Sequence, residues 1–85
     1  MQTNFKAAVV WSGTNCPWCE RAKALLDTHN IPYITKHIGV HVTKEEFFEA
    51  NQGARTVPQV WLDDVLVGGF EDLKKVLASD NAQAA

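Results

Sequence analysis

The sequence predicts one α/β domain in which four strands and three helices follow one another in the order β-α-β-α-β-β-α. Three observations support this prediction. First, a continuously apolar run at residues 7–11 is followed by a helical pattern. Second, two further helical patterns come later in the chain. Third, two short stretches rich in β-forming residues lie between the second and the third helical pattern. Apolar periodicity of this kind is the main sequence signal of secondary structure.

The first strand, the first helix and the second strand form one predicted unit. The first strand covers about Lys6 to Trp11, and its unbroken apolar character is typical of a strand buried on both faces. The first helix covers Pro17 to Thr28, because proline loses no hydrogen bond at the first helical position. Its buried stripe has helical spacing and consists of Ala22, Leu25, Leu26 and His29. A second strand from Tyr33 to Ile38 then implies a parallel pair with a right-handed crossover.

The second helix has clear signals at both ends. Thr43 and Glu46 have the spacing of a capping box, in which each residue binds the backbone N–H of the other. Gly53 offers a left-handed end after the helical pattern. We therefore expect a short helix between these positions.

The last three elements are two strands and a helix. The strands are predicted at Val57 to Leu62 and Val65 to Val67, and only Asp63-Asp64 separates them, which leaves room for a tight hairpin turn. Pro58 is unusual inside a strand, because it has no N–H for the ladder. A third helix follows Gly68-Gly69, and its inner face consists of Phe70, Leu73, Val76 and Leu77.

Composition and charge limit the classes of function. The chain has 85 residues, 46% of them hydrophobic, so one core at about residues 6–78 can form, and residues 79–85 are expected to fray. The net charge is −2 and there is no basic block, so we expect no nucleic-acid partner. We see no apolar run of membrane-spanning length and no signal-peptide core. Two cysteines without a targeting segment indicate a reducing compartment, and we expect a cytoplasmic monomer.

The two cysteines form the motif Cys16-Pro17-Trp18-Cys19 at the start of the first predicted helix. A Cys-x-x-Cys pair between a strand and a helix is typical of a thiol–disulfide redox site. The N-terminus of a helix carries partial positive charge and free N–H groups, which stabilise the reactive thiolate. We predict that Cys16, at the cap position, is the nucleophile and that Cys19, one turn into the helix, is the resolving thiol.

Two alternatives to a redox pair stay open on these residues alone. A purely structural disulfide would close a loop of about four residues and stabilise the fold by at most roughly 2 kcal/mol. A zinc site is the second alternative, because His37-x3-His41 follows the cysteines. The segment between the two pairs is longer than in zinc fingers, so we favour a redox pair, no metal site, and solvent-facing histidines.

The chain resembles the glutaredoxins, the compact members of the thioredoxin superfamily, over about residues 6–78. Three motifs at the family's spacing support the resemblance, namely Cys16-Pro17-Trp18-Cys19 with its helix, Ala54-Arg55-Thr56-Val57-Pro58-Gln59-Val60, and Gly68-Gly69-Phe70-Glu71-Asp72-Leu73. The resemblance implies one glutaredoxin domain with a thioredoxin-like fold, in which three helices cover both faces of a four-stranded mixed sheet. It also implies a cis peptide bond before Pro58, against the active-site cysteines.

The resemblance further implies a glutathione-dependent oxidoreductase that reduces protein disulfides and glutathione mixed disulfides. Glutathione is then the reductant and co-substrate, no cofactor is bound permanently, and ribonucleotide reductase is a candidate protein partner. In the family the Thr-Val-Pro backbone pairs with glutathione, and the glycine pair receives its γ-glutamyl end. Carried over to this chain, the glutathione-binding residues are Trp18, Arg55, Thr56, Val57, Pro58, Gly69, Phe70 and Glu71.

Three positions depart from the family's usual residues. Gly13 replaces a lysine that commonly holds the glycyl carboxylate of glutathione, Glu71 replaces an aspartate, and Trp18 replaces a tyrosine. Arg55 is a candidate to take over part of the carboxylate contact. Two other functions stay open, namely a redoxin re-reduced by thioredoxin reductase, which Gly13 allows, and an iron–sulfur cluster carrier of two chains and two glutathiones, which Pro17 disfavours.

Overall fold

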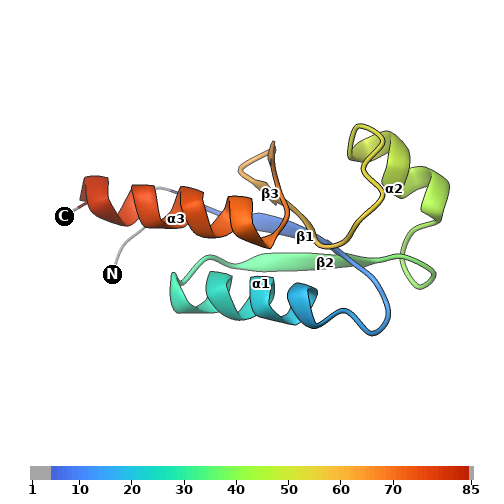
Figure 1. The fold of residues 1–85 in the computed structure, drawn as a ribbon, viewed down its shortest axis with the longest axis horizontal. Coiled ribbons are helices and arrows are strands. Elements are labelled where there is room, and N and C mark those ends of the chain that lie inside the picture. Colours follow the sequence, from blue (N-terminus) through green and yellow to red (C-terminus); the bar gives the residue numbers. More distant parts are fainter. Residues whose placement is uncertain (1–4, 85) are drawn as a thin grey trace.

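The computed structural model of the chain describes residues 5–84, and their side chains as far as residue 79. The order of its elements is the predicted one. They are β1 (Ala8–Ser12), α1 (Pro17–Thr28), β2 (Tyr33–His37), α2 (Lys44–Ala50), β3 (Gln59–Leu62), β4 (Val65–Gly68) and α3 (Phe70–Ala84). Figure 1 shows these elements along the chain.

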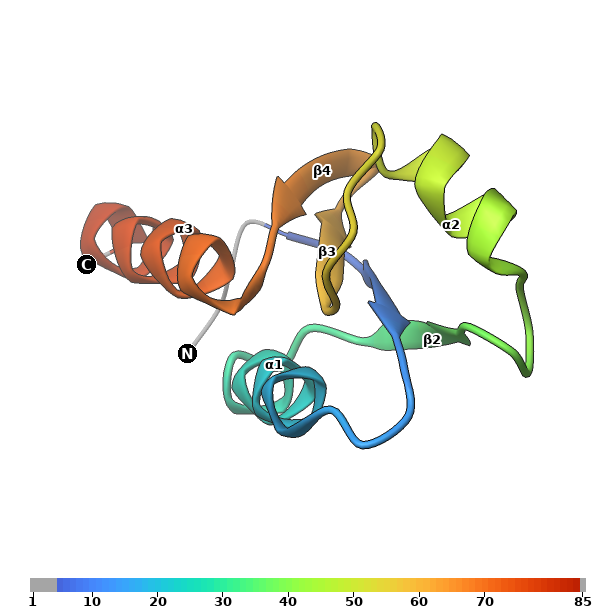
Figure 2. The same cartoon turned by 45° about the vertical axis from the view of Figure 1, so that its right-hand side comes forward.

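The four strands form one mixed sheet in the order β2-β1-β3-β4. Strand β1 pairs parallel with β2 and antiparallel with β3, and β3 pairs antiparallel with β4. Helices α1 and α3 cover one face of the sheet, and α2 lies on the other side (Figure 2). The central position of β1 explains its apolar sequence, because four of its five residues are buried. The predicted thioredoxin-like fold is confirmed.

The core lies between the sheet and the pair α1 and α3. Its buried residues are Ala8, Val10, Ala22, Leu26, Ile31, Val60, Leu62, Leu73 and Leu77. On α3 the predicted inner face is confirmed, because Leu73 and Leu77 are buried while Phe70 and Val76 pack against the core. Fraying from residue 79 stays a prediction, since α3 runs to Ala84 and residue 85 lies outside the described part. Among the described residues, no helix is long and apolar enough to span a membrane.

The ends of all four strands differ from the sequence prediction, and β4 ends at Gly68, one residue after the predicted Val67. β1 begins at Ala8 rather than Lys6, because the side chain of Asp63 accepts hydrogen bonds from the N–H groups of Lys6 and Ala7 at 3.0 and 3.1 Å. These two N–H groups are therefore not available for strand pairing. β2 ends one residue before the predicted Ile38, which forms an isolated bridge with Val42.

Strand β3 begins at Gln59, two residues later than predicted. The Val57–Pro58 peptide bond is cis, as the resemblance implied, and Pro58 has no N–H to donate to a ladder. The segment from Thr56 to Pro58 is therefore a loop in front of the sheet. The predicted tight turn at Asp63-Asp64 is confirmed, and both residues have the positive φ angles, 47° and 69°, of a two-residue hairpin turn.

Helix α2 is held at both ends by side chains. The predicted capping box is present, with the Thr43 hydroxyl accepting from the Glu46 N–H at 3.1 Å and the Glu46 carboxylate accepting from the Thr43 N–H at 2.8 Å. At the other end the buried Asn51 donates its amide to the Phe47 carbonyl at 2.9 Å. The Asn51 side-chain oxygen accepts from the Trp61 indole N–H at 2.8 Å. Asn51 thus fastens α2 to β3.

Replacing Asn51 by alanine should therefore lower the free energy of unfolding by about 1–3 kcal/mol, because the buried carbonyl of Phe47 and the indole N–H of Trp61 both lose a partner. Urea denaturation followed by tryptophan fluorescence measures this change. Glu49→Ala, an exposed substitution in the same helix, is the matched control and should have little effect. Equal stability of the two variants would show that Asn51 does not fasten α2.

Candidate active site

The two cysteines lie at the N-terminus of α1, where the prediction placed them. Cys16 is the N-cap residue, and its Sγ accepts a hydrogen bond from the Cys19 N–H at 3.1 Å. The two sulfurs form a disulfide with the Cα atoms 5.2 Å apart. Cys19 is fully buried, whereas Cys16 is partly exposed. A substrate can therefore reach the sulfur of Cys16 more readily than that of Cys19.

The loop before β3 lies against this disulfide. The Val57 carbonyl oxygen is 3.8 Å from the Cys16 Sγ. The buried side chain of Gln59 supports the loop, because its amide donates to the Thr56 carbonyl at 3.0 Å. No described residue accepts a hydrogen bond from the Val57 N–H. The backbone of Val57 thus keeps its N–H open beside the redox sulfur.

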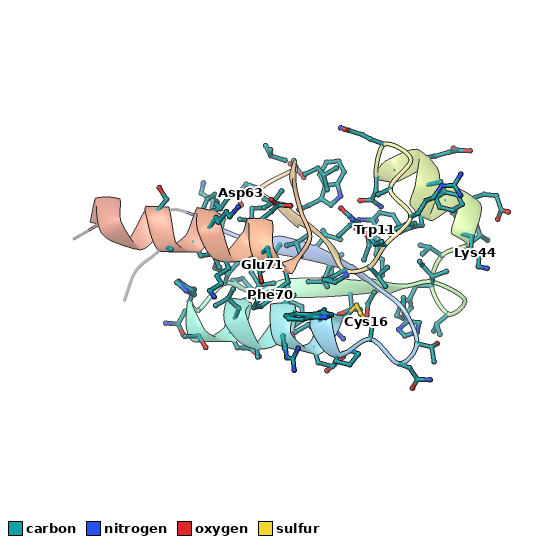
Figure 3. The ribbon with its side chains drawn as sticks, in the orientation of Figure 1. Trp11, Cys16, Lys44, Asp63, Phe70 and Glu71 are labelled. Atoms are coloured by element: carbon teal, nitrogen blue, oxygen red, sulfur yellow. A yellow bond between two sulfur atoms is a disulfide. The ribbon has the colours of Figure 1, made fainter. Side chains whose placement is uncertain are left out.

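A groove of about 280 Å³ runs from this loop to the start of α3. Figure 3 shows Phe70 and Glu71 at the start of α3, to the left of the disulfide of Cys16. The groove is lined by Trp18, Thr56, Val57, Pro58, Gly69, Phe70, Glu71 and Asp72. It therefore brings together seven of the eight residues that the resemblance implied for glutathione. Arg55 is exposed and does not line the groove.

An aromatic pair forms one wall of the groove. The Trp18 side chain is 49% exposed, and its ring centroid is 5.3 Å from that of Phe70. The guanidinium of Arg21 lies 4.4 Å from the centroid of the same indole. Sequence reasoning missed Arg21 as a cation at this site, although its position three residues after Trp18 places both on one face of a helix.

Asp72 is the second residue at the groove that sequence reasoning missed. It follows Glu71 in the first turn of α3, so two carboxylates lie at this end of the groove. Gly68 makes room for it, because a Cβ at Gly68 would be 2.5 Å from the Asp72 Oδ2, and its φ of +123° also favours glycine. The available signal was the pair of adjacent acidic residues, Glu71 and Asp72, that follows the two glycines and Phe70.

On the other side of Cys16 lies a more open hollow of about 530 Å³. Gly13 and His37 line it, and the His37 Nε2 is 3.3 Å from the Thr14 hydroxyl. His41 is exposed as predicted, whereas His37 is half-buried, because its ring packs beside the active-site loop. Among the residues that the structure describes, no three His, Cys, Asp or Glu side chains gather in a group that could hold a metal ion.

Comparison with known proteins identifies the family. Residues 8–67 match the Glutaredoxin family model. The chain belongs to the glutaredoxin family. It is 37% identical over 67 residues to glutaredoxin 1 of Rickettsia prowazekii, a match that covers 76% of this chain and 70% of the relative. Glutaredoxins are thiol–disulfide oxidoreductases, so the Cys16–Cys19 pair belongs to an enzyme of this class.

Solved glutaredoxin structures agree with the fold. The structure of reduced Escherichia coli glutaredoxin superimposes with a TM-score of 0.74 at 28% identity, and covers 89% of this chain and 98% of its own. A buckwheat glutaredoxin–glutathione complex has a TM-score of 0.67 at 26% identity, and covers 88% of this chain and 79% of its own. The thioredoxin-like architecture is therefore that of proteins with the same chemistry.

Proposed function

We propose that this glutaredoxin takes its electrons from glutathione, and that Cys16 and Cys19 are its nucleophile and resolving thiol. The observation that supports this most is the groove beside Cys16, which combines an open backbone at Val57 with the start of α3. A similar fold from buckwheat is known as a glutathione complex. Glutathione is a short extended peptide, so an open backbone N–H beside the reactive sulfur suits it.

The groove offers complementary groups to each part of the tripeptide. Val57 N–H and C=O pair with the cysteinyl backbone, which brings the glutathione sulfur to Cys16. The first N–H groups of α3 have no intrahelical partner and bind the γ-glutamyl carboxylate. Glu71 and Asp72 then bind its ammonium group. Trp18 and Phe70 cover the aliphatic part of the chain.

The reaction proceeds by two thiol–disulfide exchanges. The Cys16 thiolate, stabilised by the Cys19 N–H and the helix N-terminus, attacks a glutathione mixed disulfide; a bond forms from Cys16 to the glutathione sulfur, and the substrate thiolate leaves. A second glutathione thiolate attacks the bound glutathione sulfur, which releases oxidised glutathione and restores the Cys16 thiolate. With a protein disulfide, Cys16 first forms a mixed disulfide with one sulfur of the protein. The Cys19 thiolate then attacks the Cys16 sulfur, which releases the reduced protein and leaves the Cys16–Cys19 disulfide. Two glutathione thiols reduce this disulfide in turn and leave as oxidised glutathione.

The cellular setting completes the proposal. Protein disulfides are the substrates, with ribonucleotide reductase as a candidate. A reducing cytoplasm suits a dithiol that must cycle. All residues of the proposed site come from one chain, so a single copy is sufficient for catalysis.

A coupled assay tests the choice of reductant. The reduced chain is supplied with NADPH and either glutathione plus glutathione reductase or thioredoxin reductase, and NADPH consumption is followed on a mixed disulfide. We expect turnover with the glutathione system. Turnover with thioredoxin reductase alone would instead support the redoxin alternative, and a purified chain with the visible absorbance of an iron–sulfur cluster would support the carrier alternative.

Gly13→Lys should improve the use of glutathione by up to about fivefold, because an exposed ion pair with the glycyl carboxylate contributes about 0.2–1 kcal/mol. A Cβ at position 13 would be 3.3 Å from the Val57 Cγ2. The Val57 side chain must therefore shift slightly to accept the lysine. The apparent KM for glutathione at low and high salt is the measurement. Gly13→Gln is the matched uncharged control; an equal gain from glutamine would exclude the electrostatic explanation.

A further inference from the structure

One part of the sheet is left uncovered on the side opposite α1 and α3. The strand register places four apolar side chains next to one another in a row across all four strands. They are Ile34, Val9, Trp61 and Leu66. Helix α2 lies over one end of this side (Figures 1 and 2), where Phe47 contacts Trp11 with ring centroids 6.1 Å apart. The row itself stays accessible, and Ile34 is 58% exposed.

The row borders a groove of about 320 Å³ that is separate from the redox site. The groove is lined by Val9, Trp11, Lys36, Ala50, Trp61 and Asp64. The hydrogen bond from the Trp61 indole to Asn51 fixes the ring in place. A rigid, half-buried tryptophan among aliphatic side chains is typical of the centre of a protein–protein interface. We call the apolar row, together with Lys36 and Asp64, the open face.

The two charges of the open face line the same groove and come from opposite sides of β1. Lys36 is on β2, next to β1 on one side, and its ammonium lies 4.8 Å from the Trp11 ring centroid. Asp64 is in the turn between β3 and β4, on the other side of β1. Within the described part of the chain, neither forms a salt bridge. The open face thus carries one unpaired cation and one unpaired anion.

We propose that the open face binds a second copy of this chain, as a reversible dimer with two-fold symmetry. In a two-fold interface the same surface meets itself, and an axis midway between Lys36 and Asp64, across the line that joins them, places Lys36 of each copy against Asp64 of the other. We infer this axis because it pairs both charges. A strongly acidic partner would repel Asp64, and a strongly basic partner would repel Lys36. The apolar rows of the two copies cover each other, and Trp61 lies near the centre. The redox groove lies elsewhere and stays accessible in both copies.

The association itself is measured by sedimentation velocity under excess dithiothreitol, which prevents intermolecular disulfides. The full chain is examined between about 10 µM and about 1 mM, the range over which a dimer with a Kd of roughly 100 µM becomes the main species. We expect the weight-average sedimentation coefficient to rise from that of the monomer toward that of the dimer. A concentration-independent monomer up to the upper limit would overturn the proposal.

Substitutions then identify the surface. Ile34→Thr keeps a β-branched residue on the strand and should weaken association about tenfold, because exposed apolar area is lost twice in a symmetric dimer. Asp64→Asn should weaken it about fivefold, since an exposed ion pair is also lost twice. Val40→Thr, at an exposed valine outside the open face, is the matched control and should change nothing. Association that all three variants leave unchanged would place the contact elsewhere and overturn the proposal.

A double-mutant cycle tests the pairing of charges between copies. Lys36→Glu should weaken the dimer more than Lys36→Gln, because the new carboxylate faces Asp64 of the other copy. In the Lys36→Glu background, Asp64→Asn should strengthen the dimer, although it weakens the dimer in the native background. Additive effects without this reversal of sign would contradict the two-fold arrangement. Mixed-disulfide reduction by each variant should equal that of the native chain, since none of these residues lines the redox groove.

Discussion

Cys16→Ser should lower the reduction of both glutathione mixed disulfides and protein disulfides by at least about a thousandfold, which corresponds to about 4 kcal/mol in the barrier. The serine hydroxyl stays protonated near neutral pH and forms no mixed disulfide, so the first exchange cannot occur. The coupled glutathione assay with a small mixed disulfide measures the loss.

Cys19→Ser is the matched control for this variant, because it removes the same disulfide from the oxidised form. If the two substitutions differ in activity, the difference reports the role of the thiol rather than the loss of the crosslink. Retained mixed-disulfide reduction in Cys16→Ser, with loss in Cys19→Ser, would show that the two roles are reversed.

Cys19→Ser itself should separate the two activities. Reduction of a glutathione mixed disulfide should stay within about threefold of the native rate, since external glutathione resolves the intermediate at Cys16. Reduction of a protein disulfide should fall by about a hundredfold or more, because the buried Cys19 acts intramolecularly at a high effective concentration. Both rates are followed with one preparation, using a mixed disulfide and a disulfide-containing protein as substrates.

The reduced Cys19→Ser variant must be shown to be folded, because Cys19 is a fully buried residue of α1 and its replacement places a hydroxyl in the interior. Cys19→Ala provides a second, apolar replacement that leaves no hydroxyl in this position. Loss of both activities in both folded variants would show that Cys19 does more than resolve the intermediate.

The order of elements could be predicted because its signals are local. Pro17 at the first helical position and the capping box of Thr43 and Glu46 depend on a few neighbouring residues, and the structure has both. The strand ends depend on contacts between distant segments. The pairing of Asp63 with the N–H groups of Lys6 and Ala7 spans 56 residues or more, and no periodicity in the sequence indicates it.

The residues of the candidate site that belong to the three sequence motifs could be predicted from the sequence. The three motifs of the resemblance meet at one groove, because the start of α1, the loop before β3 and the start of α3 lie close together in this fold. Arg21 and Asp72 were missed, since their roles depend on which way a side chain leaves its helix. Arg21 faces the Trp18 ring, and Asp72 occupies the space beside Gly68.

The central claim is that glutathione occupies the groove between Val57 and the start of α3 while bonded to Cys16. The most direct measurement is the change in backbone ¹⁵N–¹H shifts when the reduced Cys19→Ser protein is converted to its mixed disulfide with glutathione. We expect the largest changes outside the cysteine motif at Val57, Gly69, Phe70 and Glu71, with little change on α2. Shifts confined to the cysteine motif and the hollow beside Gly13 and His37 would contradict the claim, because glutathione would then bind outside this groove.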